Sequence, residues 1–165
     1  MRPTIKAVKE LFGETPVRGA EIGVYCGENA GHIMSHLNID KLHLVDCWVP
    51  TEDYTIAEGV QNNYNNVVRL FGTDPKVNII RAYSVDASKF IPDKSLHFVY
   101  IDAEHRYHGI KADIDAWLPK VMDGGIIGGH DYDYPIRPGV KEAVDEVFGE
   151  NVCTDPDQND WYVML

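Results

Sequence analysis

The sequence predicts an α/β fold: a doubly wound, mostly parallel sheet with helices on both faces and an antiparallel hairpin at the C-terminus. Short runs rich in valine, isoleucine, leucine, tyrosine and phenylalanine alternate with segments whose apolar residues recur every three or four positions. Such alternation is typical of parallel strands joined by right-handed helical crossovers. The last two apolar runs are separated by DPDQND, residues 155–160, a turn-rich sequence that predicts the hairpin.

Five predicted strands form the parallel part of the sheet. They are RGAEIGVY (18–25), KLHLVDCW (41–48), VNIIRA (77–82), SLHFVYID (95–102) and GIIGG (125–129). Each is short and consists mainly of residues that suit a buried, pleated surface. The two hairpin strands are expected over about 151–154 and 161–165.

Helices are expected between the strands because the apolar residues there fall on one helical face. A short helix over about 29–37 follows the first strand. Three longer apolar faces consist of Ile56, Val60, Tyr64, Val67 and Phe71; of Ile110, Ile114, Trp117, Leu118 and Val121; and of Val140, Ala143, Val144, Val147 and Phe148. Before the first strand, Ile5–Phe12 presents Val8 and Leu11 on one face, which packs either on the sheet or on a partner.

Length and composition indicate one ordinary globular domain over residues 1–165. The chain has 44% hydrophobic and 25% charged residues, and globular chains of this size bury roughly 70% of their unfolded surface. The net charge of −11 argues against nucleic acid and anionic membrane surfaces as partners, because clustered lysine and arginine bind phosphates. No stretch approaches the ~20 apolar residues of a membrane span. The N-terminus lacks the apolar core of a secretory signal, so we expect a cytoplasmic protein with three reduced cysteines.

Polar residues stand at or just beyond the end of each predicted parallel strand. They are Glu21, Asp46, Ser84, Asp86, Asp102, Glu104, His105, His130 and Asp131. The carboxyl ends of parallel strands meet at one edge of a sheet, and ligands bind at that edge. The sequence therefore predicts one small-molecule site assembled from the ends of five strands.

The first of these strand ends carries a glycine loop, Glu21-x-Gly23-x-x-x-Gly27. The glycines allow a sharp turn and a close approach of the backbone to a ligand. The spacing is wider than that of the dinucleotide fingerprint Gly-x-Gly-x-x-Gly. Glu28 at the start of the following helix would repel a phosphate, so the loop favours a cationic ligand and disfavours a nicotinamide dinucleotide.

The next two strand ends predict contacts with a nucleoside. Asp46 lies about 20 residues beyond the glycine loop, where doubly wound nucleoside-binding domains place a carboxylate for the ribose hydroxyls. Trp48, or Cys47 beside it, either lies against an adenine ring or belongs to the core. Asp86 either accepts a hydrogen bond from an adenine amino group or caps the helix that follows it.

Four segments together resemble the class I S-adenosylmethionine-dependent methyltransferases, and within them the macrocin-type small-molecule O-methyltransferases. They are EIGVYCG, HLVDCW, AYSVDASKF and YIDAEHRYHGIKADIDAWLPKVMDGGIIGGHDY, within residues 17–150. The resemblance implies a Rossmann-like sheet of seven strands, the last two forming a hairpin. It also implies an enzyme that moves a methyl group from S-adenosylmethionine to a hydroxyl of a small molecule such as a sugar, a phenol or another natural product.

The resemblance also assigns residues to the cofactor. It implies that Glu21, Gly23 and Gly27 hold the methionine part and that Asp46 holds the ribose. Ser84 and Asp86 line the adenine, and Trp48 and Asp102 complete the expected contacts. Asp102 and Asp131 match two acids that, in metal-dependent relatives, bind a magnesium ion that grips the substrate.

Two histidines are candidates for the chemistry of the reaction. His130 stands where many metal-dependent relatives have a carboxylate, so it either coordinates a softer divalent ion beside Asp102 and Asp131 or acts as a base without an ion. His105 follows Asp102 by three residues, and an unperturbed pKa near 6.5 would suit proton abstraction at neutral pH. We expect Asp113 and Asp115 on a solvated helix face.

Only segments 49–63 and 132–139 are free to cover the site, so the pocket is expected to be open or to be closed by a second subunit in a homodimer. The tyrosine- and proline-rich segment 132–139 either shapes the acceptor pocket or forms a surface turn. The alternative function is a nonenzymatic protein that binds S-adenosylmethionine or a nucleoside with the same fold. The presence of Asp102, His105 and Asp131 disfavours that alternative, because cofactor binding alone does not require all three.

Overall fold

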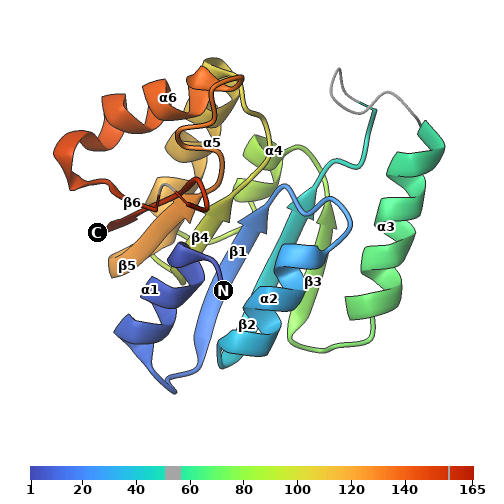
Figure 1. The fold of residues 1–165 in the computed structure, drawn as a ribbon. Helices are drawn as coiled ribbons and strands as arrows, with labels where there is room; N and C mark the ends of the chain where they lie inside the picture. The colour runs from blue at the N-terminus through green and yellow to red at the C-terminus, as the bar shows by residue number, and fades with distance from the viewer. Residues whose placement is uncertain (51–56, 156) are drawn as a thin grey trace.

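A computed structural model of the chain describes residues 1–50, 57–155 and 157–165. Its elements in chain order are α1 (Pro3–Phe12), β1 (Val17–Ile22), α2 (Glu28–His36), β2 (Ile39–Asp46), α3 (Ala57–Phe71), β3 (Val77–Arg81), α4 (Ser84–Ser88), β4 (Leu96–Ile101), α5 (Tyr107–Trp117), η1 (Leu118–Lys120), β5 (Val121–Gly129), α6 (Pro138–Phe148), η2 (Gly149–Asn151), β6 (Cys153–Asp155) and β7 (Asp160–Met164). The seven strands form one sheet in the order β3-β2-β1-β4-β5-β7-β6 (Figure 1).

Strands β1 to β5 are parallel, and β7 runs antiparallel to both of its neighbours, β5 and β6. The doubly wound, mostly parallel sheet with a C-terminal antiparallel hairpin is therefore confirmed. The strand order reverses between β1 and β4, which are adjacent although two other strands separate them in the sequence. This reversal is the point at which such sheets open a crevice for ligands.

Two hydrophobic clusters cover the two faces of the sheet. Residues alternate between them along each strand, because successive side chains of a strand point to opposite faces. On β2, Leu44 packs in the cluster with α1, α2 and α3, and Val45 packs in the cluster with α4, α5 and α6. Trp117 is completely buried in the second cluster, as its helical spacing predicts. In the described part of the chain, no helix is long and apolar enough to cross a membrane.

The N-terminal helix α1 packs against β5 and β7 of its own sheet. Val8 is buried there, whereas Leu11 is exposed. The Thr4 hydroxyl donates to the carbonyl of Trp161 over 3.1 Å and so fixes the start of α1 on β7. Of the two packing alternatives, the structure shows the intramolecular one.

Element boundaries differ from the predicted ones at the glycines. β1 ends at Ile22 rather than at residue 25, because Gly23 with a φ of 86° turns the chain out of the sheet. β5 begins at Val121, four residues before the predicted start, and its pairing with β4 shifts register near Gly124, which has a φ of 77°. The preceding helix consequently ends at Trp117. The predicted helical position Ile56 and part of the covering segment 49–63 lie outside the described residues.

Asp113 is not on a solvated face, contrary to expectation. Its side chain is buried within α5, and burial raises its pKa to about 6 although a hydrogen bond with Ser84 opposes the shift. The same Ser84 hydroxyl accepts a hydrogen bond from the indole nitrogen of Trp117 over 2.8 Å. Ser84 thus connects α4 to α5.

Candidate functional site

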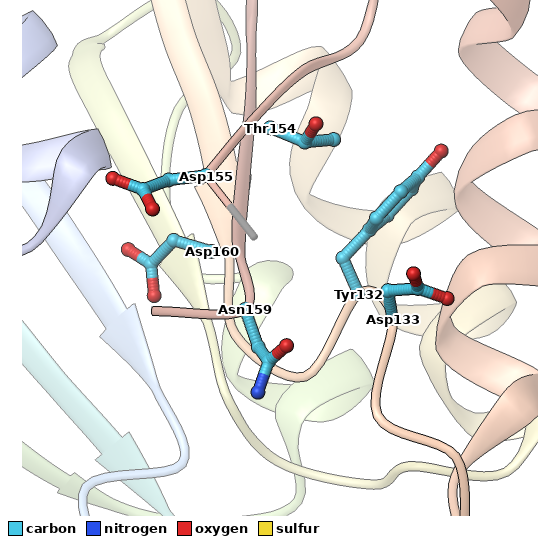
Figure 2. A pocket seen from close by; sticks show the side chains of 6 residues that line it. All are labelled: Tyr132, Asp133, Thr154, Asp155, Asn159 and Asp160. Carbon is cyan, nitrogen blue, oxygen red and sulfur yellow. The ribbon is translucent and has the colours of Figure 1, made fainter. Parts of the chain in front are cut away.

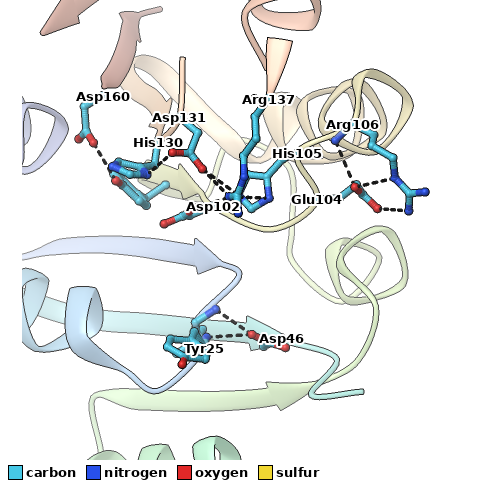
Figure 3. Close-up of polar contacts among 12 residues, drawn as sticks. Tyr25, Asp46, Asp102, Glu104, His105, Arg106, His130, Asp131, Arg137 and Asp160 are labelled. Atoms are coloured by element: carbon cyan, nitrogen blue, oxygen red, sulfur yellow. Dashed lines mark hydrogen bonds and ion pairs between the residues drawn. The ribbon is translucent and has the colours of Figure 1, made fainter. Parts of the chain in front are cut away.

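Backbone hydrogen bonds bring the ends of the central strands together at one edge of the sheet. The amide of Gly23 donates to Val45, and the amide of Asp102 donates to Ile22 over 2.7 Å. The amide of His130 likewise donates to the carbonyl of Ile101. The ends of β1, β2, β4 and β5 therefore lie at one edge of the sheet, and Figure 3 shows Asp46 on one side of it and Asp102, His105, His130 and Asp131 on the other.

Gly23 is where β1 comes closest to the end of β4. Its φ of 86° lies in the left-handed region, and an added Cβ would lie 2.0 Å from the carbonyl oxygen of Asp102. Only glycine allows that approach. Gly27, with a φ of 89°, directly precedes α2, so the glycine loop ends at the N-terminus of that helix.

Glu21 is a buried carboxyl group beneath this loop. Its side chain is 1% exposed, and burial raises its pKa to about 8 although a hydrogen bond from Asn29 opposes the shift. The Asn29 amide donates to Glu21 Oε1 over 3.0 Å. Within the described residues, Glu21 Oε2 and Asn29 Oδ1 are buried and have no hydrogen-bond partner. Leaving a buried acceptor unpaired costs about 1–3 kcal/mol, so these two atoms are suited to a ligand that brings donors.

Asp46 holds the glycine loop against β2. Its Oδ2 accepts from the amides of Val24 and Tyr25 over 3.0 and 2.9 Å, and its Oδ1 accepts from the amide of Trp48 over 2.7 Å (Figure 3). A carboxylate offers about four acceptor positions, so one remains for a hydroxyl donor.

Trp48 belongs to the core, which was one of its two predicted places. Its side chain is 3% exposed and packs edge-on against Tyr64, with ring centroids 5.0 Å apart. Its indole nitrogen donates to the carbonyl of Tyr25 over 2.9 Å. In this arrangement Trp48 supports the loop from below, and its ring faces are not open to an adenine.

Ser84 and Asp86 both lie in the short helix α4. The Ser84 hydroxyl is engaged with Trp117, and the exposed Asp86 forms an ion pair with Lys89 at 2.7 Å. The N-cap of α4 is Tyr83, which makes no side-chain capping bond, so Asp86 does not cap the helix. Asp86 lies at the surface, and its contact with an adenine stays a prediction.

The ends of β4 and β5 build a cluster of two carboxylates and one imidazole. His105 Nε2 lies 3.4 Å from Asp102 Oδ1 and 3.1 Å from Asp131 Oδ2. Burial lowers the pKa of His105, but the hydrogen bonds with the two carboxylates outweigh it and raise the pKa to about 9. His105 is therefore protonated at neutral pH in this arrangement, and it does not have the near-neutral pKa that the sequence suggested for a base.

His130 lies on the other side of Asp131. Its Nδ1 is 3.0 Å from Asp131 Oδ1, and this contact raises the pKa of His130 against the lowering effect of burial. Between them the two histidines hold the pKa of Asp131 well below its ordinary value, although burial alone would raise it. Among the described residues, the group whose ligand atoms lie within 4.8 Å of one another is Asp102, His105 and Asp131. His105 thus takes the place in this group that the sequence suggested for His130.

Two neighbours of these residues, Arg137 beside the cluster and Asp160 beside His130, were not anticipated from the sequence. Arg137 Nη1 lies 2.7 Å from Asp131 Oδ2 and within 3.0 Å of both ring nitrogens of His105. On the far side, Asp160 lies next to His130 (Figure 3) and accepts a hydrogen bond from the hydroxyl of Tyr100 over 3.1 Å. No local pattern marks Arg137 or Asp160 as site residues, since each reaches the cluster only through folding.

Two hollows border the loop that follows β5. The smaller, about 50 Å³, lies between this loop and the hairpin (Figure 2) and is lined by Tyr132, Asp133, Thr154, Asp155, Asn159 and Asp160. The larger, about 350 Å³, is open and lies between the loop and α6, against Tyr134, Pro135 and Pro138. The smaller hollow has room for little more than a single polar group, so the body of an acceptor cannot lie inside it.

A family comparison identifies the domain. The model of the family described as a methyltransferase domain matches residues 20–132, which span the glycine loop and the cluster at β5. The chain belongs to this methyltransferase domain family. The matching residues include most of those in which the class I methyltransferase resemblance was found, so that resemblance is confirmed.

Two curated proteins are similar to the chain. An uncharacterised protein of Acanthamoeba polyphaga mimivirus is 25% identical over 152 residues, which are 88% of this chain and 66% of that protein. An uncharacterised protein of Sinorhizobium fredii is 32% identical over 53 residues, which are 32% of this chain and 6% of that protein. The chain therefore spans less than two thirds of the length of these curated relatives.

Solved structures show the same fold. The O-methyltransferase NovP shares 18% identity and a TM-score of 0.68, covering 97% of this chain and 78% of that one. A Podospora anserina methyltransferase with bound S-adenosylhomocysteine shares 12% identity and a TM-score of 0.70, covering 98% and 75%. The TDP-rhamnose 3'-O-methyltransferase CalS11 shares 16% identity and a TM-score of 0.66, covering 98% and 76%. The fold is thus the Rossmann-like methyltransferase fold.

Proposed function

We propose that this methyltransferase domain transfers a methyl group from S-adenosylmethionine to a hydroxyl of a small molecule. The observation that supports it most is Glu21, a buried carboxyl with an unpaired oxygen beneath a glycine loop at the switch point of a methyltransferase fold. A cationic amino acid derivative supplies donors and positive charge together.

The residues at the crevice fit that cofactor. Glu21 would receive the amino group of its methionine part, and the glycine loop would let the backbone approach it closely. Asp46 has one acceptor position left for a ribose hydroxyl, and Asp86 would reach the adenine from the surface. The carboxylates of Glu21, Asp46 and Asp102 together favour a sulfonium over a phosphate.

The chemistry of methyl transfer requires alignment and removal of one proton. Asp102 and His105 would orient the acceptor hydroxyl, and Asp131 would hold the imidazolium form of His105 and orient His130. A protonated His105 cannot accept the hydroxyl proton, so without an ion the reaction should become faster as pH rises toward 9 and His105 Nε2 loses its proton. Near pH 9, neutral His105 would act as the base that accepts the hydroxyl proton.

The cluster also fits a divalent cation, because two carboxylates and one imidazole within 4.8 Å are ligands that magnesium or manganese accepts. Asp102, His105 and Asp131 would hold it. When bound, such an ion lowers the pKa of an acceptor hydroxyl and orients it.

Calorimetry with S-adenosylhomocysteine tests the cofactor site. Because the pKa of Glu21 is about 8, this group is largely protonated at pH 7, and an ammonium group placed against it should drive its proton off. We expect wild type to bind S-adenosylhomocysteine with release of up to one proton per site, read from titrations in two buffers of different ionisation enthalpy. Glu21→Gln should bind at least ~10-fold more weakly without proton release.

The exposed Glu10→Gln on α1, away from the glycine loop, is the control and should behave as wild type. Binding of NAD in place of S-adenosylhomocysteine would contradict the proposal. Methyl transfer is then assayed on a panel of sugars and phenols with and without chelator. Tight cofactor binding with no transfer to any acceptor would favour the nonenzymatic alternative.

The expected homodimer and the cytoplasmic location stay predictions. The homodimer is tested by sedimentation of the purified chain with and without S-adenosylhomocysteine. A monomer under both conditions would contradict the homodimer, and only the acceptor could then cover the open hollow beside residues 132–139.

A further inference from the structure

Arg137 places a permanent cation in the cluster at the ends of β4 and β5. It lies just before α6, and its side chain is about one third exposed. Its Nη1 is 2.7 Å from Asp131 Oδ2, 2.8 Å from His105 Nε2 and 3.0 Å from His105 Nδ1. The guanidinium therefore lies against the atoms that a divalent ion would use.

A divalent ion and Arg137 cannot use these atoms together. To bind a metal, His105 must offer an unprotonated nitrogen and Asp131 a free oxygen lone pair. Arg137 donates to the same Asp131 oxygen that His105 Nε2 contacts at 3.1 Å, and a guanidinium does not lose its proton in proteins. A metal at this place would also face the positive charge of Arg137 at contact distance.

The loop that brings Arg137 to the cluster is poorly covered by the rest of the protein. Ile136, its neighbour, is 77% exposed, and the guanidinium carbon lies 5.9 Å from the ring centre of Tyr134. The amide of Arg137 donates to the carbonyl of Tyr134 over 2.8 Å. Withdrawal of Arg137 would therefore disturb few buried contacts and would move the side of the 350 Å³ hollow that Tyr134 forms.

We propose that Arg137 is the resident cation of the Asp102–His105–Asp131 cluster and that a divalent ion binds there only in exchange for it. This inference rests on the metal-assisted part of the proposed function. Arg137 is then a positioning residue, because it acts through Asp131 and His105. The exchange couples occupancy of the cluster to the position of the 132–137 loop at the acceptor side.

Direct binding of Mn²⁺ to the full chain tests the exchange, measured by the loss of the free-ion electron paramagnetic resonance signal. We expect Arg137→Met, which keeps the aliphatic stem without the charge, to bind Mn²⁺ at least ~10-fold more tightly than wild type. Arg106→Ala removes a neighbouring arginine that pairs with Glu104 at 2.8 Å, and it should stay within about twofold of wild type. Adding Asp131→Asn to Arg137→Met should abolish the gain.

Equal or weaker Mn²⁺ binding by Arg137→Met would overturn the exchange, and so would the absence of Mn²⁺ binding in every variant. Arg137→Ala serves in the same way if Arg137→Met does not unfold cooperatively. Titration with S-adenosylhomocysteine separates the two hypotheses. If wild type binds S-adenosylhomocysteine but no variant binds Mn²⁺, the exchange is refuted and metal-free methyl transfer still stands. If wild type does not bind S-adenosylhomocysteine, the methyl-transfer proposal is refuted, and the Mn²⁺ comparison alone decides the exchange.

Discussion

At the scale of single residues, the site is governed by how many charged groups share Asp131. Two histidines and Arg137 lie within 3.1 Å of its oxygens. Burial would raise the pKa of Asp131, but its hydrogen bonds with the two histidines outweigh burial and lower it. The carboxylate is thus the common partner of His105, His130 and Arg137.

The raised pKa of His105 predicts a pH-dependent contribution to stability. The folded-state pKa of about 9 lies above the unfolded value near 6.5, so the stabilisation is complete below pH 6.5 and is lost as pH rises through 9. His105→Gln should therefore be less stable than wild type by ~1 kcal/mol at pH 6, a value reduced for partial solvent screening, and the difference should vanish near pH 10.

Urea unfolding at intervals from pH 6 to pH 10 measures this difference. The exposed His32→Gln on α2 is the control for loss of a histidine as such. A His105→Gln deficit that stays constant over this pH range would show that His105 contributes by packing rather than by charge.

At the scale of elements, the site exists because β1 and β4 end next to each other. Gly23 allows this contact, and Asp102 follows β4 directly, so the glycine loop and the cluster are positioned by the same junction. The loop is then fixed on its other side by Asp46 at the end of β2. Three adjacent strands, β2, β1 and β4, thus position the glycine loop and Asp102.

A substitution at Gly23 should break this junction. Gly23→Ala places a Cβ 2.0 Å from the Asp102 carbonyl at a left-handed φ, and we expect a loss of at least ~3 kcal/mol in the free energy of unfolding. Gly31→Ala in α2 is the matched control. Apart from its chain neighbours and the backbone of its own helix, no atom of the described residues lies within 4 Å of its added Cβ, so we expect a gain of ~0.5–1 kcal/mol from helix propensity.

Chemical denaturation of both variants measures these changes in the free energy of unfolding. If Gly23→Ala were as stable as wild type, the close approach of the two strand ends would not be a requirement of the fold. In that case its effect on cofactor binding would have to be measured separately.

At the scale of the whole molecule, the sheet divides the core into two clusters, yet it also connects them. Each central strand contributes residues to both faces, as Leu44 and Val45 do on β2. Neither face can lose its packing without exposing the sheet that the other face needs. We therefore propose that residues 1–165 unfold as one domain.

Cavities on opposite faces test this proposal. Ile33 on α2 and Ile114 on α5 are both completely buried, one in each cluster. Ile33→Ala and Ile114→Ala should each cost ~3 kcal/mol, and the double variant should lose about the sum, because the two sites lie in separate clusters. In each variant, tryptophan fluorescence and far-ultraviolet circular dichroism should report one coincident transition. Two separated transitions in either single variant would show independent units.

Much of the architecture could be predicted from local patterns. Strand and helix periodicity indicates the parallel sheet, its hairpin and the edge at which Glu21, Asp46, Asp102 and Asp131 gather. Strand boundaries were less predictable. Glycine can adopt a left-handed φ but need not, so the sequence does not show that β1 stops before Gly23 whereas β5 continues through Gly124. The prediction that Asp113 is solvated was wrong, because Asp113 is buried and forms a hydrogen bond with Ser84 of the neighbouring helix α4.

The sequence by itself determined the fold class, the family and the edge of the sheet that holds the candidate site, because these depend on periodicity and on residue order along the chain. Only the tertiary structure decided that Trp48 is core, that His105 rather than His130 joins the two carboxylates, and that Arg137 lies among them. The physical reason is that such contacts join side chains from different loops, whose separation depends on how the helices pack. The pKa of each group follows from those distances, and therefore no local pattern contains it.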